Sequence, residues 1–504
     1  VMESQLGIQS IDLRVAPIDY ETARRLPENL ARRHGIIPVQ IADGQLLLAM
    51  KDPLDRVAIQ GVRLIVGMPV TPLFAVERDI LRTIERVFGQ QRVADQVAED
   101  LARTPIAAMD EVAATLDLES APMVRLVNSI IENAVRSQAS DIHIEPKSNR
   151  LRIRTRVDGI LFDVLSTNMR VHGPLVTRLK VMANMNIAEK RLPQDGKIVT
   201  QVDHRQIDLR VSSMPTTYGE KLAIRILDPT NFLIGKQKLG LSEQDIAKFN
   251  RLIARPYGII LVTGPTGSGK TTTLYSMLSE LDSNHQSLVT LEDPVEYDLD
   301  GISQTQIHVQ AGITFASGLR TLLRQDPDVI MVGEIRDAET AEIAVRAALT
   351  GHLVLSTLHT NDAPGAVIRL MDIGIEPYLI ASSLVGVIAQ RLVRRVCPDC
   401  REEYLTNSQE RDILGITDPE PLRLVKGRGC SACNKTGYRG RIGVFEILEI
   451  NRDLRAIINK RVSLDEIREE AVRLGMAPLW QDCREKVIQQ ITTLEEAIRV
   501  TKIY

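Results

Sequence analysis

The feature that most constrains the fold of this chain is a glycine-rich octapeptide between an apolar stretch and a helical pattern. Residues 264–271 read Gly-Pro-Thr-Gly-Ser-Gly-Lys-Thr, directly after the aliphatic residues 258–263. This is the Gly-x4-Gly-Lys-Ser/Thr phosphate loop in its strand–loop–helix context, and the helical pattern continues to Leu281. From Gly258 onward apolar strands alternate with helices, so the sequence predicts an α/β domain on a largely parallel sheet.

The loop predicts a bound nucleoside triphosphate with Mg²⁺. Its glycines let backbone N–H groups turn toward phosphate oxygens, and the following helix N-terminus adds partial positive charge. Lys270 is expected to reach the β- and γ-phosphates, and the Thr271 hydroxyl is expected to bind Mg²⁺. The predicted nucleotide-binding residues of this segment are Gly264, Pro265, Thr266, Gly267, Ser268, Gly269, Lys270, Thr271 and Thr272.

Further polar residues flank the apolar strands that follow. Glu334 ends the stretch 328–334 and is the candidate that orients the attacking water, although Gly333 occupies the place of the usual Walker B aspartate. Glu292 and Glu296 follow another strand, and His352 and His359 bracket a third. Strand-end positions favour site roles, but a lone histidine is more often a hydrogen-bonded core or rim residue, so both interpretations stay open for His352 and His359.

Four of the five cysteines form two Cys-x2-Cys pairs, which are Cys397 with Cys400 and Cys430 with Cys433. Four thiolates suit a closed tetrahedral Zn²⁺ site without an open position, so the predicted zinc is structural. The alternative is four unliganded thiols, because residues 401–429 form a longer loop than zinc ribbons usually have. Arginines near the pairs, among them Arg391, Arg394 and Arg439, are interpreted as a docking face or as a solvated surface.

Composition narrows the class of protein. The chain has 504 residues, 44% apolar residues and a net charge of −3, which excludes bulk disorder and argues against a protein that coats a polyanion. No apolar stretch reaches the roughly 18 residues of a membrane-spanning helix. The N-terminal residues lack an apolar signal core, so export is not expected.

The residues before the phosphate loop predict two further folded segments. The first mixes helices and short strands, with a hairpin turn at Asp43-Gly44. After an acidic, alanine-rich linker, the second begins with an amphipathic helix at 123–137 and continues with alternating strands, two of which have a basic face. Asp195-Gly196 is predicted as a turn, and residues 379–389 are predicted as a buried helix.

Together these motifs resemble those of the secretion ATPases of the type II secretion and type IV pilus superfamily. The segments around Lys270, Glu292, Glu334 and His359 match its Walker A, Asp-box, Walker B and His-box motifs, in that order. Upstream, residues 140–146, 156–159 and 192–197 match as well. The chain length, the cysteine pairs and residues 494–501 favour the type II secretion branch.

The resemblance implies a homo-hexameric, Mg²⁺-dependent ATP hydrolase with RecA-like P-loop NTPase domains. It implies that Arg210 and Arg225 approach the γ-phosphate and act with Lys270 and Glu334, while the Asp-box and His-box residues line the site. The boundaries that it predicts are residues 1–92 for a small N-terminal α/β partner-docking domain, 93–120 for a linker, 121–231 for a PAS-like α+β domain, 232–241 for a second linker and 242–504 for the ATPase domain, with a zinc-binding insertion at 395–440 and C-terminal helices at 451–504.

The resemblance also implies a cytoplasmic protein, peripheral on the inner membrane, that drives pseudopilus assembly and protein export. Its expected partners are inner-membrane secretion platform proteins, GspL-like and GspF-like, so membrane association is indirect and no nucleic acid is bound. The alternatives are a type IV pilus extension ATPase, a nucleic-acid translocase and a non-hydrolysing scaffold. A related N-terminal domain in some pilus ATPases binds cyclic di-GMP, but residues 26–53 show no complete motif for that ligand.

Overall fold

The structure is a computed structural model, and two compact units divide the chain. The described residues are 8–13, 18–42, 44–85, 87–89, 122–228, 235–418 and 420–501. The units are Val1–Asp228 with Arg428–Gly437, and Pro229–Gly427 with Tyr438–Tyr504. The predicted linker at 93–120, Asp43 of the predicted turn and residues 229–234 lie outside the described residues.

The first part of the chain folds around a small mixed sheet. Strands β1 (Ile36–Ala42) and β2 (Gln45–Met50) are antiparallel and pair Ala42 with Gln45, as a hairpin requires. Strand β3 (Val70–Phe74) runs parallel to β2. Helices of this part are α2 (Tyr20–Ala23), α3 (Glu28–His34) and α4 (Arg56–Val66). An aliphatic core that includes Leu46, Leu48 and Val62 holds these elements together.

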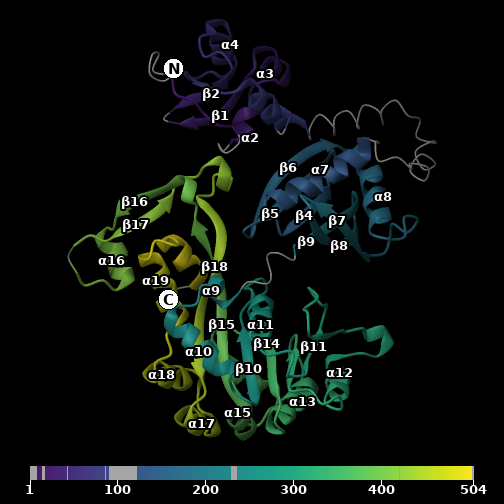
Figure 1. Ribbon diagram of the computed structural model, residues 1–504, viewed down its shortest axis with the longest axis vertical. Helices are drawn as coiled ribbons and strands as arrows, with labels where there is room; N and C mark the ends of the chain where they lie inside the picture. Colours follow the sequence, from purple (N-terminus) through teal and green to yellow (C-terminus); the bar gives the residue numbers. More distant parts are fainter. Residues whose placement is uncertain are drawn as a thin grey trace. The chain divides into compact units, whose positions relative to one another are not determined.

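The second part is a six-stranded antiparallel sheet with one face covered by helices (Figure 1). Its strand order is β6-β5-β4-β9-β8-β7. The elements are α7 (Pro122–Arg136), β4 (Asp141–Pro146), β5 (Arg150–Val157), β6 (Ile160–Asn168), α8 (His172–Met182), β7 (Gln194–Val202), β8 (Arg205–Thr216) and β9 (Gly219–Leu227). Alternate strand residues such as Ile142 and Ile144 pack with Leu126 and Leu175 of the helices, which leaves the charged residues on the opposite face.

The predicted turn at Asp195-Gly196 is wrong, because both residues lie within strand β7. The glycine instead allows the backbone of Ala183 to come close to β7, because a β carbon at Gly196 would lie 2.3 Å from the carbonyl oxygen of Ala183. A turn and a tight backbone contact select the same residue type, so the dipeptide alone does not separate them.

The third part contains the phosphate loop on a seven-stranded sheet of order β12-β11-β13-β14-β10-β15-β18. All neighbouring strands are parallel except β15 and β18, which are antiparallel. The strands are β10 (Gly258–Thr263), β11 (Leu288–Glu292), β12 (Ser303–Gln306), β13 (Val329–Val332), β14 (Leu353–Leu358), β15 (Leu384–Val396) and β18 (Tyr438–Glu449). The helices are α9 (Lys236–Leu239), α10 (Glu243–Ile253), α11 (Lys270–Leu278), α12 (Phe315–Leu322), α13 (Ala338–Leu349), α14 (Ala363–Asp372) and α15 (Pro377–Ser383). The carboxyl ends of the parallel strands therefore meet at one edge, where the phosphate loop lies.

The predicted helix at 379–389 is only half right, because α15 ends at Ser383 and β15 begins at Leu384. Strand β15 lies between β10 and β18 and is buried along most of its length. A strand buried on both faces has a continuous apolar sequence, which periodicity does not distinguish from a buried helix.

The cysteine-containing segment is inserted between β15 and β18. It contains β16 (Arg401–Leu405), α16 (Ser408–Leu414) and β17 (Arg423–Gly427). The C-terminal stretch is helical, as predicted, and comprises α17 (Arg452–Asn459), α18 (Leu464–Arg473), α19 (Leu479–Ile488) and α20 (Leu494–Thr501). Across the described ranges, every helix is too short or too polar to cross a membrane.

Candidate nucleotide and metal sites

The phosphate loop connects a buried strand to a helix that begins at the predicted lysine. Every residue of β10 is buried, and α11 starts at Lys270. Gly264, Gly267 and Gly269 have φ values of 149°, 78° and 89°. A β carbon at Gly264 would lie 2.4 Å from the carbonyl oxygen of Gln390, so this position needs glycine for space as well as for conformation.

The Lys270 ammonium lies over the loop. It donates hydrogen bonds to the carbonyl oxygens of Gly264 at 2.9 Å and Pro265 at 3.1 Å. Burial lowers the pKa of Lys270, whereas the Glu334 carboxylate acts to raise it. The predicted phosphate-binding cation and the predicted catalytic acid are thus close enough to interact electrostatically.

Glu334 lies at the same sheet edge, beyond the end of β13. Its Oε1 atom is 2.5 Å from an Arg336 guanidinium nitrogen, and its Oε2 atom is 3.6 Å from Nε2 of His359. The backbone before it is fixed, because Gly333 N–H donates to Leu291 O at 2.8 Å and Thr357 Oγ1 donates to Gly333 O at 2.7 Å. The structure therefore brings Glu334, His359 and the phosphate loop together.

The glycine in the Walker B aspartate position has a steric reason. A β carbon at Gly333 would lie 3.2 Å from the carbonyl oxygen of Leu291, on the neighbouring strand β11. At that separation the neighbouring strand would have to give by a few tenths of an ångström, so any side chain at this position is crowded.

Glu292 is placed beneath the loop in a closed set of hydrogen bonds. Its side chain is 3% exposed and accepts from Tyr275 Oη at 2.5 Å, Thr290 Oγ1 at 2.6 Å and Gln304 Nε2 at 2.9 Å. Burial and the bond to Glu292 raise the pKa of Tyr275 well above its ordinary value. The backbone N–H of Glu296 donates to the same tyrosine oxygen at 3.3 Å. Most of the acceptor capacity of Glu292 is therefore used to join α11, β11 and β12.

The two predicted histidines lie at opposite ends of the same strand, β14. His359 follows the carboxyl end of β14, beside Glu334, whereas His352 precedes its amino end. The Nδ1 atom of His352 is 2.9 Å from the carbonyl oxygen of Ala347, and its own carbonyl accepts from Gly258 N–H at 3.0 Å. Since a six-residue strand spans about 20 Å, His352 does not reach the phosphate loop of its own chain.

Sequence reasoning missed the contribution of β15. Its Gln390 contacts the phosphate loop and accepts from Thr273 Oγ1 at 2.6 Å. The next residue, Arg391, donates to Oδ1 of Asn361 at 2.9 Å, and burial lowers the pKa of its guanidinium. Thr360 and Thr263 have their hydroxyl oxygens 2.7 Å apart. Only the position of β15 beside β10 brings Gln390 and Arg391 to the site, and that position is hidden when residues 379–389 are interpreted as a helix.

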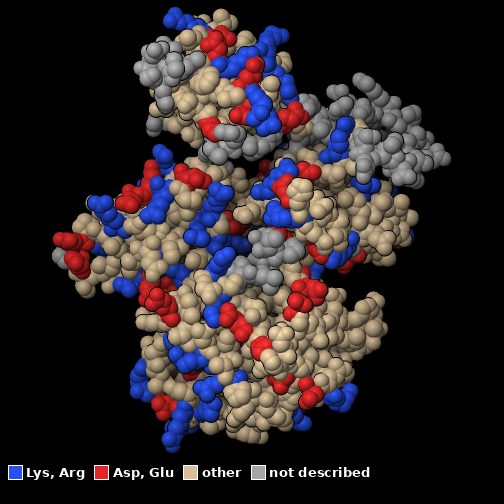
Figure 2. All heavy atoms as spheres, in the orientation of Figure 1, with Lys and Arg blue, Asp and Glu red and all other residues tan. Residues whose placement is uncertain are grey.

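Arg210 and Arg225 lie directly opposite each other on β8 and β9. The Arg225 side chain is 61% exposed, and its Nε atom lies 3.6 Å from an Asp141 carboxylate oxygen. Like charges in register across antiparallel strands repel each other, and the Asp141 carboxylate offsets part of the Arg225 charge. On the face that Figure 2 shows, Lys and Arg side chains of this part lie among Asp and Glu side chains.

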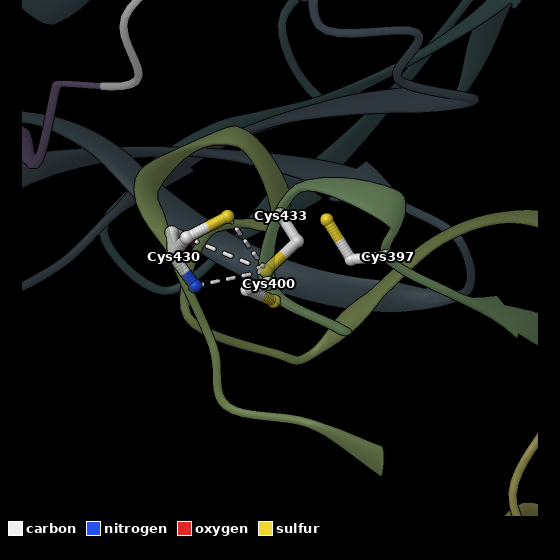
Figure 3. A group of neighbouring side chains, drawn as sticks. All are labelled: Cys397, Cys400, Cys430 and Cys433. Atoms are coloured by element: carbon white, nitrogen blue, oxygen red, sulfur yellow. Dashed lines mark hydrogen bonds between the residues drawn. The ribbon is translucent and has the colours of Figure 1, made fainter. Parts of the chain in front are cut away.

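The four paired cysteines converge on one point. Their Sγ atoms all lie within 4.8 Å of one another, and Figure 3 shows the side chains gathered from two chain segments. The sulfurs of Cys430 and Cys433 are 3.7 Å apart. Tetrahedral zinc with Zn–S bonds of 2.3 Å would place sulfurs about 3.8 Å apart, so the cluster has the right size and donor set for this ion.

Two backbone N–H groups lie within hydrogen-bond distance of the Cys433 sulfur. This sulfur accepts from Cys430 N–H at 3.2 Å and from Gly437 N–H at 3.3 Å. Such N–H bonds stabilise a thiolate that also binds a metal. The fifth cysteine, Cys483, is buried in α19, where burial raises the pKa of its thiol to about 12.

One of the arginines near the cysteine pairs is not solvated. Arg394 is largely buried and lies 2.7 Å from Glu496, whose side chain is 0% exposed, and its guanidinium carbon is 4.0 Å from the Tyr438 ring centre. The interpretation of Arg394 as a docking or solvated residue is therefore wrong. Arg439 is exposed and pairs with Asp399 at 3.1 Å.

Comparison with known proteins identifies the class. The family model described as type II/IV secretion system protein matches residues 117–499, and the model described as MshEN domain matches residues 6–94. The type II secretion system protein E of Pseudomonas aeruginosa is 46% identical over 487 residues, which cover 95% of this chain and 96% of that protein. The type IV pilus assembly ATPase PilB of Myxococcus xanthus is 41% identical and covers 99% of this chain and 89% of that protein.

A solved structure agrees. The pilus retraction motor PilT with bound ADP is 28% identical, with a TM-score of 0.50, and the match covers 73% of this chain and 95% of PilT. The chain belongs to the type II/IV secretion ATPase family, a family of ATP hydrolases that form hexamers. The predictions of family, fold class and enzyme class are confirmed.

Proposed function

We propose that this protein is a hexameric, Mg²⁺-dependent ATPase that drives pseudopilus assembly in type II secretion. The observation that carries the proposal is the convergence of Lys270, Glu334 and His359 at one edge of the parallel sheet. Phosphoryl transfer to water requires a cation that binds the phosphates, an acid that orients the water and a polar partner for that acid.

Each residue has a stated task in this reaction. Lys270 and the loop N–H groups hold the β- and γ-phosphates, and the Thr271 hydroxyl binds Mg²⁺. Glu334 orients the water that attacks the γ-phosphorus as the bond to ADP breaks. Arg210 and Arg225 neutralise charge on the γ-phosphate.

The remaining predicted site residues support these groups. Glu292 and Glu296 hold the strand ends beneath the loop through Tyr275. Arg336 holds one oxygen of the Glu334 carboxylate at 2.5 Å, and His359 lies 3.6 Å from the other and assists its placement. His352, at the far edge of the sheet, has no task at the nucleotide of its own chain.

The cysteine cluster holds Zn²⁺ in this proposal. Four thiolates complete its coordination, so the metal stabilises the inserted segment and supplies no chemistry to ATP. The proposed domains are the N-terminal partner-docking domain at 1–92, the PAS-like domain at 121–231 and the ATPase domain at 242–504, connected by the linkers at 93–120 and 232–241.

We assign the protein to the cytoplasmic face of the inner membrane, where the N-terminal domain docks on GspL-like and GspF-like platform proteins. The similarity to type II secretion proteins over nearly the full chain supports this assignment. The pilus assembly ATPases, at slightly lower identity, support the alternative of pilus extension.

Three measurements test the proposal. Lys270→Ala should abolish ATP turnover, and near-normal turnover would refute the phosphate-site assignment. Deletion of the gene in its host should stop the export of proteins into the medium and leave surface pili intact. Loss of pili with normal export would favour pilus extension, and turnover strongly stimulated by DNA would favour a nucleic-acid translocase.

A further inference from the structure

The segment that follows His359 is fixed by side chains from several elements. Thr360 N–H donates to Thr263 Oγ1 at 2.8 Å, which ties the segment to the end of β10. Asp362 accepts from Gly365 N–H at 2.9 Å as the N-cap of α14, and its other oxygen lies 2.7 Å from Arg468 of α18. His359 therefore lies between the end of β14 and a segment that β10, the N-cap Asp362 and Arg468 hold in place.

A buried carboxylate on β18 connects this start to a second helix. Glu446 is 5% exposed, and its Oε1 atom accepts from Ala363 N–H, at the first residue of α14, at 2.7 Å. Its Oε2 atom accepts from Leu479 N–H, at the first residue of α19, at 3.1 Å. One side chain thus satisfies orphan donors at the N-termini of both helices.

The buried Glu446 carboxylate is surrounded by groups that shift its pKa in both directions. Burial and, less strongly, the nearby Asp362 carboxylate raise the pKa of Glu446, while the two backbone donors and the Arg468 charge act against that rise. The positive ends of both helix dipoles also favour a negative charge here. Glutamine would not replace it fully, because its amide offers one acceptor oxygen and its NH₂ group only donates.

We propose that Glu446 is a positioning residue for ATP hydrolysis. By holding the start of α14 against β18, it keeps His359 beside Glu334 at the separation on which the proposed catalytic function rests. It touches neither phosphates nor water, and acts through the backbone of Ala363.

The structure also provides a second attachment for α19, so a variant at Glu446 need not unfold. Asp482, in the first turn of that helix, accepts from Phe445 N–H of β18 at 2.8 Å. Asp482 in turn forms a buried ion pair with Lys486 at 2.5 Å. This attachment remains when Glu446 is changed.

The experiment compares Glu446→Gln with Glu449→Gln, a matched change on the same strand. Glu449 is partly exposed and pairs with Arg251 at 2.7 Å. For Glu446→Gln, kcat should fall by about tenfold to a hundredfold, because small misplacements of catalytic groups have effects of that size. The KM for ATP should stay within about twofold, since phosphate binding is unchanged. Glu449→Gln should change neither.

The split between kcat and KM decides the question. An unchanged kcat for Glu446→Gln would overturn the positioning role. The role would also be overturned if turnover and the binding of a fluorescent ATP analogue both fell in proportion to the folded fraction, as measured by circular dichroism. In that case the variant would only be less folded. A wild-type protein without Mg²⁺-dependent ATP turnover would refute the proposed function itself, which is a different result.

Discussion

The catalytic assignment is tested most directly by replacing Glu334 with glutamine. The change keeps the size of the side chain and removes one negative charge at the end of β13. Its bond to Arg336 and its approach to His359 weaken, but the backbone bonds of Gly333 to Leu291 and Thr357 remain. We therefore expect the sheet edge to keep its geometry.

The size of the effect follows from the two roles of this carboxylate. Loss of a positioned acid or base typically slows a reaction by about 10²- to 10⁴-fold, which is about 3–5.5 kcal/mol in the barrier. Binding should not weaken, because Lys270 and the loop are intact. The Glu334 carboxylate interacts favourably with the Lys270 ammonium, so its neutralisation leaves that cation free for the phosphates. ATP affinity should stay equal or rise.

Phosphate release and titration with a fluorescent ATP analogue separate the two effects. Glu342→Gln is a suitable control, because Glu342 is exposed on α13 and its ion pair with Arg346 is long at 3.9 Å. A loss of kcat below about tenfold would contradict a catalytic role for Glu334. Loss of nucleotide binding in parallel with turnover would show that the residue is needed for the fold of the site.

Two further predictions concern metal and stability. Native protein should contain about one zinc per chain, as one four-thiolate site implies. Cys430→Ser should lower that zinc content. Native protein without metal would refute the site. Glu496→Gln should lower the free energy of unfolding by about 3–5 kcal/mol at neutral pH, because it leaves buried Arg394 without its charged partner. Burial alone would raise the pKa of Glu496, but Arg499 and Arg394 outweigh it and lower the pKa. In the wild type, the ionised Glu496 therefore stabilises the fold at pH values above its ordinary pKa of 4.5, and this stabilisation is lost as the pH falls below that value through the lowered pKa. Urea unfolding should thus give free energies of unfolding for wild type and Glu496→Gln that approach each other in acid.

Much of the nucleotide site could be predicted from local sequence. A phosphate loop is a contiguous segment whose chemistry depends on residue types at fixed spacing, so Gly264 and Lys270 are identified without a structure. Glu334 and His359 follow because parallel strands bring their carboxyl ends to one edge. The same rule places His352 at the wrong edge, since it precedes its strand.

What could not be predicted depends on contacts between segments far apart in the chain. Gln390 reaches the loop only because β15 lies beside β10, and a continuous apolar run conceals whether it is strand or helix. Glu446 shows no signal at all, because a buried glutamate between two helix starts has the same sequence appearance as an exposed one. Tyr275 is similar: its helix is evident, but its bond to Glu292 requires the position of β11.

The site of the cysteine-containing insertion has an evolutionary consequence. The chain leaves β15 after Val396 and returns to β18 at Tyr438, and these two residues pair with each other. The two ends are therefore only about 5 Å apart, a gap that a two-residue turn also closes. A shortened chain could therefore close this gap with a turn and keep the pairing of β15 with β18 in register. It would, however, lose Leu414 and Leu424 from the hydrophobic core that they share with the sheet, so gain or loss of the cysteine segment also changes the packing of the ATPase domain.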